Sequence, residues 1–167
     1  IAISGLPSAK PAIEWRVVKL QGAEGRDTAW TPLDLTRGGD GFTGKALAPS
    51  GGWYRLELRQ LSDGATGTIT AVEPVAVGEV FIVAGQSYAD GCNDELLRVH
   101  DPQFRVAAYD LTNKAWRVAH DPLPNVKPGG TIWPAMGDAL LPFARVPIGL
   151  GNVAVGGPAA LLWLPGT

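Results

Sequence analysis

The sequence has little of several residue types on which common functional sites depend. It has one cysteine, Cys92, and two histidines among 167 residues, so an internal disulfide is excluded and the paired ligand spacing of a zinc site is missing. The formal net charge is −2, and neither sign is clustered into the basic stripe that nucleic-acid phosphates require. No apolar run approaches the ~20 residues that cross a bilayer. We therefore expect neither a nucleic acid nor a membrane as partner.

The first residues also lack the basic start and apolar stretch of a signal peptide. The cellular compartment stays open on the sequence alone, with a secreted or periplasmic location favoured.

Glycine and proline are abundant instead, with 22 Gly and 14 Pro, about twice the usual share. Both residues break helices, which argues against a helical bundle or a coiled coil. The apolar content of 46% is too high for a disordered chain. The sequence therefore predicts many short strands joined by tight turns, with a core large enough for one ordinary domain or two small ones.

The first part of the chain alternates in the way that strands do. Ile13, Trp15 and Val17 share one face of a predicted strand. Tyr54, Leu56 and Leu58 share a face in the next clear strand, and residues 68–72 form a further one. Strand after strand with Gly/Pro turns and no helical period favours a small antiparallel β-sandwich over residues 1–75.

The pattern changes over residues 76–167. The uninterrupted apolar run at 80–84 predicts a strand that is buried on both faces of a parallel sheet, and residues 103–118 predict a hairpin. A helix is expected from Trp133 to about Arg145, followed by a second buried strand over 147–155. The apolar positions of this helix recur at i+3 and i+4: Trp133, Met136, Leu140 and Phe143. This order predicts an α/β fold that contains a βαβ unit.

Parallel neighbouring strands would bring Ser87 and Gly156-Gly157 to the same edge of the sheet. Open α/β sheets bind ligands at the carboxyl ends of their strands. A serine hydroxyl opposite glycine N–H groups is suited to attack a carbonyl and to hold the oxyanion that forms. The alternative is that Ser87 only caps a turn and that the glycines only turn a loop.

Three ordered segments resemble a known family. Residues 77–87 read VGEVFIVAGQS, which resembles block I of the SGNH (GDSL-type) hydrolases and is closest to V-x-x-G-Q-S-N of sialate O-acetylesterase-like carbohydrate esterases. Residues 131–140, TIWPAMGDAL, resemble their W-P-A-L-x-x-x-L helix. Residues 155–159 and 163–166 resemble V-G-G-T-S followed by W-L-P-G. The resemblance implies an incomplete SGNH- or flavodoxin-like α/β domain after the β-sandwich.

The same resemblance implies a set of roles. Ser87 would be the nucleophile, and its own backbone N–H and that of Gly157 would form the oxyanion hole. Gln86 would shape the elbow around the serine, and Gly156 and Tyr88 are secondary candidates. The implied reaction is hydrolysis of an acetyl ester on a sugar through an acyl-enzyme, with no metal and no organic cofactor.

The chain departs from the family pattern at two places near the serine. Tyr88 stands where the family has a compact asparagine, and Pro158-Ala159 replace Thr-Ser after the paired glycines. Proline lacks an N–H group, so one potential donor to an anion disappears.

A larger departure concerns the base that a serine nucleophile needs. No D-x-x-H motif occurs up to Thr167. His100 and His120 each precede Asp-Pro, a turn signal, and neither matches a catalytic position of the family. We expect both to lie in surface turns. The acidic cluster of Asp90, Asn93, Asp94 and Glu95 is expected to be a solvated loop.

The favoured interpretation is the nucleophile-bearing part of a carbohydrate esterase, inactive alone because its His/Asp base is missing. Leu161, Leu162 and Trp163 would then form an exposed apolar surface that favours a complementing polypeptide or a homo-oligomer. An alternative is a non-catalytic carbohydrate-binding or interaction module, favoured by Tyr88 and Pro158. A third interpretation is a structural β-sandwich with an extension.

Overall fold

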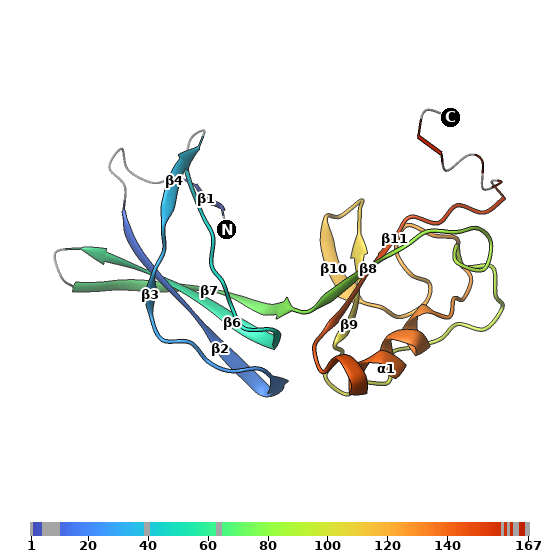
Figure 1. Ribbon diagram of the computed structural model, residues 1–167, viewed down its shortest axis with the longest axis horizontal. Helices are drawn as coiled ribbons and strands as arrows, with labels where there is room; N and C mark the ends of the chain where they lie inside the picture. Colours follow the sequence, from blue (N-terminus) through green and yellow to red (C-terminus); the bar gives the residue numbers. More distant parts are fainter. Residues whose placement is uncertain are drawn as a thin grey trace. The chain divides into compact units, whose positions relative to one another are not determined.

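The chain forms two compact units, Ile1–Val77 and Gly78–Thr167. A computed structural model describes residues 2–4, 11–38, 41–62, 65–157, 159, 161, 164 and 165. These residues form eleven strands and one helix (Figure 1). No helix among them is long and apolar enough to cross a membrane.

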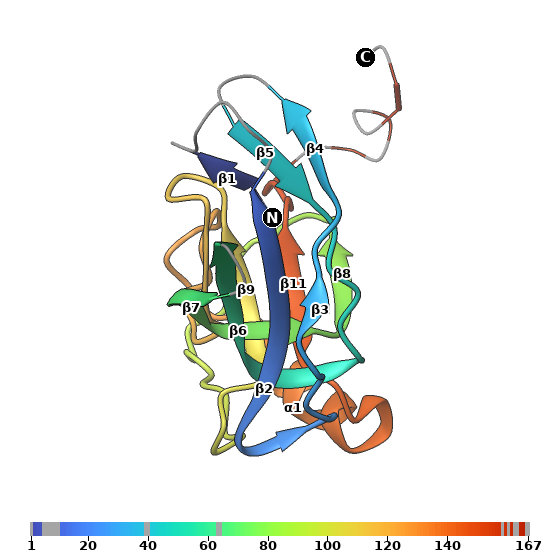
Figure 2. The same cartoon turned by 90° about the vertical axis from the view of Figure 1, so that its left-hand side faces the viewer.

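The first unit contains two sheets. The smaller sheet has the order β1 (Ala2–Ser4), β5 (Gly41–Gly44), β4 (Leu35–Gly38). The larger sheet has the order β3 (Thr31–Pro32), β2 (Ala12–Glu24), β6 (Gly51–Ser62), β7 (Ala65–Val77). All the pairings in both sheets are antiparallel, and Figure 2 shows β5 between β1 and β4.

The two sheets share one apolar core. Ile13, Trp15 and Val17 of β2 are buried in alternation with more exposed neighbours, as predicted. They cluster with Phe42 of the smaller sheet and with Tyr54 of β6. Each such side chain contributes roughly 1.5–3 kcal/mol when fully buried, so this shared core stabilises the first unit.

The second unit has one four-stranded sheet with the order β10 (Ala115–Val118), β9 (Val106–Asp110), β11 (Ile148–Asn152), β8 (Glu79–Val83). β9 and β10 form the predicted antiparallel hairpin. β11 pairs in parallel with β8 on one side and with β9 on the other. The predicted parallel neighbours are therefore confirmed.

The helix α1 (Trp133–Ala144) is confirmed with its predicted bounds to within one residue. Pro134 lies in its first turn, where no intrahelical N–H partner is lost. Its buried residues are Pro134, Gly137 and Leu141. Phe143, one of the four apolar positions whose spacing predicted the helix, is 85% exposed. At 3.6 residues per turn, Phe143 lies about 120° around the helix from Gly137.

The predicted α/β fold with an SGNH- or flavodoxin-like βαβ start is also wrong. Such a fold covers both faces of its sheet with helices, whereas strands dominate the described residues and α1 is their single helix. The segments that join β8, β9 and α1 are rich in helix breakers, including Gly85, Gly91 and Pro102 before β9 and Pro124 before α1. These segments form turns, bends and stretches without regular structure instead.

The position of β8 in the sheet also differs from its prediction. Among the described strands it lies at the edge of the sheet, and of its five residues only Val83 is buried. Val80 is 60% and Ile82 is 70% exposed. The prediction that this strand is buried on both faces is therefore wrong.

Candidate functional site

The pairing of β8 and β11 continues beyond the ends of both strands. Asn152 lies opposite Val83 at the last paired position. Val153 then donates its N–H to the carbonyl of Val83 at 2.9 Å, and Val155 donates to Gly85 at 3.0 Å. Gly156 and Gly157 follow directly. This pairing places the two glycines at the carboxyl edge of the sheet. The carboxyl edge is the one at which β8 and β11 end and the serine segment begins.

Ser87 lies in one helical turn that starts just after β8. The carbonyl of Gln86 accepts hydrogen bonds from the N–H groups of Ala89 at 2.8 Å and of Asp90 at 3.0 Å, and the Ser87 carbonyl accepts a weaker one from Asp90 at 3.2 Å. Ser87 is partly exposed, and Gln86 and Tyr88 are exposed, with 75% of Tyr88 accessible. The turn that carries Ser87 therefore lies at the surface of this unit.

Two side chains anchor this turn to the rest of the unit. Asn152 of β11 donates from Nδ2 to the carbonyl of Ala89 at 2.8 Å, and the indole N–H of Trp133 donates to the same oxygen at 3.2 Å. Asn152 is 1% exposed. Sequence reasoning missed this residue, although a polar position inside the apolar run 147–155 was a signal for it.

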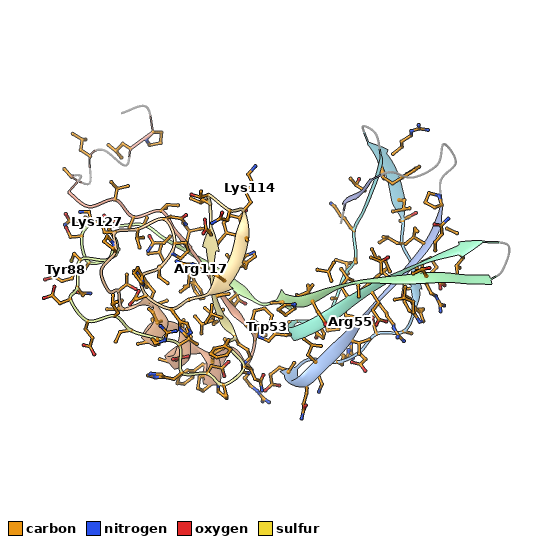
Figure 3. All side chains as sticks on the ribbon, turned by 180° about the vertical axis from the view of Figure 1, so that it is seen from behind. Trp53, Arg55, Tyr88, Lys114, Arg117 and Lys127 are labelled. Carbon is orange, nitrogen blue, oxygen red and sulfur yellow. The ribbon has the colours of Figure 1, made fainter. Side chains whose placement is uncertain are left out.

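Asp90 joins the serine turn to the glycines. Its Oδ2 accepts the N–H of Gly156 at 2.6 Å and lies 3.7 Å from Nζ of Lys127. Asp90 is only 5% exposed, so the expectation of a solvated loop is wrong for this residue, whereas Asp94 and Glu95 are exposed as expected. Tyr88 and Lys127 lie at the same end of this unit in Figure 3.

The two glycines differ in what their N–H groups can do. The N–H of Gly156 is already donated to Asp90, which removes this secondary candidate as an oxyanion donor. Gly157 is exposed at a φ of +99°, in the region that favours glycine, and a Cβ there would meet no atom within 4 Å. Pro158, Leu162 and Trp163 lie outside the described residues, and Leu161 is 65% exposed.

The two histidines line one groove that does not include the serine turn. Nδ1 of His120 accepts the N–H of Val99 at 3.0 Å, and its ring packs edge-on against Phe104 with 5.9 Å between centroids. Burial lowers the pKa of His120, and the nearby Arg98 lowers this pKa further. His100 is exposed. The two imidazoles line an open groove of about 510 Å³ together with residues 95–99 and Phe104.

The aspartates that follow the histidines do not orient them. Asp101 binds the guanidinium of Arg105 through both carboxylate oxygens, at 2.8 and 3.1 Å. Asp121 accepts the N–H of Leu97 at 3.0 Å and both the N–H and the hydroxyl of Thr131 at 2.9 Å. Each carboxylate therefore organises the local chain.

The register also separates His120 from Ser87. Ala119 donates its N–H to Val106, which lies opposite Ile148, which in turn lies opposite Glu79. This row marks the amino edge of the sheet, where β8, β9 and β11 begin. Val83 lies four residues further along β8, about 13 Å away, and Ser87 follows beyond it. His120 and Ser87 thus belong to opposite edges.

The part of the chain that the structure describes contains no group of three His, Cys, Asp or Glu side chains that could hold a metal ion. No protein-family model matches the sequence, and no curated protein matches it. One solved structure that is similar to this chain is a carbohydrate acetylesterase from Xanthomonas citri, with a TM-score of 0.47 and 18% sequence identity. The match covers 93% of this chain and 37% of that enzyme. This chain therefore spans little more than a third of the length of the enzyme.

Proposed function

We propose that this chain forms the nucleophile-bearing part of a carbohydrate-ester hydrolase, with Ser87 as the nucleophile. One observation carries the proposal. The parallel pairing of β8 and β11 runs on through Val155 and Gly85, so that Gly157 comes to the same edge as a partly exposed serine. The resemblance of residues 77–87 and 155–157 to the SGNH esterases gives these positions their roles.

The chemistry would proceed in two steps. The Ser87 oxygen adds to the carbonyl carbon of a sugar acetate while a base removes its proton, and the carbonyl oxygen becomes an oxyanion that accepts the N–H groups of Ser87 and Gly157. Collapse expels the sugar oxygen, which takes a proton, and water then releases acetate from the acyl-serine. Loss of one oxyanion donor typically raises the barrier by about 3 kcal/mol.

The base is the part that the described residues do not supply at this edge. Both histidines belong to the amino edge. The Asp90 carboxylate beside the serine turn already accepts the N–H of Gly156 and is paired with Lys127. A serine hydroxyl without an adjacent base is a weak nucleophile at neutral pH. We therefore expect the isolated 167-residue chain to have negligible esterase activity.

The test combines turnover with binding. Acetate release from an O-acetylated monosaccharide is measured for the wild type and for Ser87→Ala, with Ser50→Ala as the matched control, because Ser50 is an exposed serine of the first unit. We expect no release above background. In backbone amide NMR spectra, the acetylated sugar should shift the Ser87 and Gly157 signals of the wild type and of Ser50→Ala, whereas the deacetylated sugar should not.

The outcomes separate the parts of the proposal. Robust acetate release that Ser87→Ala abolishes would identify the nucleophile and contradict the expected inactivity. Release that survives Ser87→Ala, or the absence of any acetyl-dependent shift at Ser87 and Gly157, would contradict the proposed site.

A second candidate function is a non-catalytic carbohydrate-binding module. The observation that favours it is the phenol of Tyr88, which is 75% exposed beside the serine and offers a ring face on which a sugar can stack. Binding that is independent of the acetyl group, survives Ser87→Ala and fails in Tyr88→Ala would support this function.

A further inference from the structure

We propose that Asp90 and Lys127 are positioning residues that hold the Gly156–Gly157 loop against the turn of Ser87. The inference rests on the proposed function, because it assigns these residues the task of presenting the Gly157 N–H to the oxyanion. Neither side chain needs to touch the substrate. Their contribution is to fix the loop before the ester arrives.

Asp90 connects three segments of the second unit. Its N–H bonds to the carbonyls of Gln86 and Ser87, which fixes it to the serine turn. Its carbonyl accepts the N–H of Lys127 at 2.9 Å, and its carboxylate accepts the N–H of Gly156 at 2.6 Å. A hydrogen bond to a carboxylate is shorter and stronger than one between neutral groups. The glycine loop is therefore tied by a charged acceptor that is itself fixed beside Ser87.

Lys127 contacts the same carboxylate of Asp90. Its ammonium lies 3.7 Å from Oδ2 of Asp90, although more than half of its side chain is exposed. A Cβ on Gly156 would collide with the Lys127 ammonium and with the Asp90 carboxylate. A side chain at position 156 would therefore displace the Lys127 ammonium and the Asp90 carboxylate from their present positions. A buried carboxylate is costly without compensation, and here the ammonium and the amide both supply it.

Different contacts hold Ser87 and the Gly156–Gly157 loop in position. The serine turn has its own anchors, because Asn152 and Trp133 both donate to the carbonyl of Ala89. Among the described residues, the hydrogen bond from Gly156 to Asp90 joins the glycine loop to that turn, in addition to the backbone bond from Val155 to Gly85. Removing the carboxylate charge should therefore loosen Gly156 and Gly157 while Ser87 stays in place.

The experiment compares Asp90→Asn and Lys127→Met with two matched controls. Asp94→Asn removes an exposed acid in the same segment, and Lys45→Met removes an exposed lysine of the first unit. Amide hydrogen exchange of Gly156 should be about tenfold faster in Asp90→Asn, with a smaller increase in Lys127→Met and none in the controls. The Gly156 amide proton should also move upfield in Asp90→Asn, because its acceptor is no longer charged.

A second readout distinguishes positioning from simple support of the fold. The shift that an O-acetylated monosaccharide induces at Gly157 should weaken in Asp90→Asn, while exchange at Leu150 of β11 stays at the wild-type rate. Equal Gly156 exchange in Asp90→Asn and Asp94→Asn would overturn the inference whatever the sugar does. Faster exchange with an unchanged acetyl-dependent shift at Gly157 would overturn it as well. The absence of any acetyl-dependent shift in the wild type is a separate result, since it contradicts the proposed function, while the exchange rates still decide whether Asp90 holds the loop.

Discussion

The two edges of the sheet in the second unit differ in the groups that they leave exposed. At the amino edge, Asp121 and the His120 imidazole accept backbone N–H groups of the segment that approaches β9. At the carboxyl edge, Ser87 is partly exposed and Gly157 is exposed, and the carboxylate of Asp90 accepts the N–H of Gly156. Asp121, His120 and Asp90 thus all accept backbone N–H groups, and Gly157 and, in part, Ser87 are left exposed at the carboxyl edge.

The backbone N–H groups that need acceptors at the amino edge belong to a segment that pairs with no strand. Residues 97–101 have no regular secondary structure and are not part of the sheet. Their N–H groups go to side chains instead, with Leu97 donating to Asp121, Val99 to His120 and His100 to Asp138. Buried backbone donors are almost always satisfied. These side chains therefore replace the neighbouring strand that this segment lacks.

The largest expected effect follows from removing one of these acceptors. Asp121→Ala would leave the N–H groups of Leu97 and Thr131 and the Thr131 hydroxyl without their acceptor in the interior. We expect the free energy of unfolding to fall by about 3 kcal/mol or more. Urea denaturation of the full chain measures it, with the exposed Asp94→Ala as control. A loss for Asp121→Ala as small as that of the control would contradict the role given to this carboxylate.

A smaller effect, which depends on pH, is expected at Asp101. Burial alone would raise the pKa of this carboxyl, but the hydrogen bonds from the side chain and backbone of Arg105 outweigh burial and hold the pKa below its usual value of 3.8. A carboxyl with a lowered folded-state pKa stabilises the protein fully above its unfolded pKa. That stabilisation is lost as the pH falls through the folded value.

At neutral pH, Asp101→Asn should therefore be less stable than the wild type by about 1 kcal/mol. The difference should shrink in unfolding curves taken below pH 3.8. A difference that stays constant over this range would contradict the ion pair with Arg105 as its source.

The smallest effect is expected at His120. Burial, and then Arg98, lower the pKa of this imidazole below its usual 6.5, so the unfolded chain binds the proton more tightly. The wild type should lose stability as the pH falls from 6.5 through the lower folded-state pKa, and His120→Asn should lose less over the same interval. In this variant the side-chain amide oxygen replaces Nδ1 as the acceptor of the Val99 N–H. The acetyl-dependent shift at Ser87 should be unchanged, and its loss in His120→Asn would contradict the separation of the two edges.

Local patterns predicted much of this structure. The alternation of Ile13, Trp15 and Val17 predicted their burial, and the position of Pro134 with the spacing of apolar residues predicted α1. Turn residues predicted the β9–β10 hairpin, and two apolar strands on either side of the helix predicted the parallel pairing. In each case the determining interactions lie within a few residues or follow from the handedness and length of a connection.

The remainder depends on contacts between distant parts of the chain. The apolar run of β8 has the composition of a central strand, and only the strand order shows that it lies at an edge. Asp90 stands in a run of polar residues that looks solvated, and its acceptor role depends on the N–H of Gly156, 66 residues further along. The sequence resemblance assigned Ser87 and Gly157 their roles, but it carried no information on what holds the second relative to the first.

The separation of the two edges is tested most directly by isotope-edited nuclear Overhauser spectra of the intact chain. We expect cross-peaks between the Gly156 amide proton and protons of Asp90, and none between the Ser87 β protons and the ring protons of His100 or His120. A cross-peak from either imidazole to Ser87 would place a base beside the nucleophile, and it would contradict both the separation of the edges and the expected inactivity of this chain.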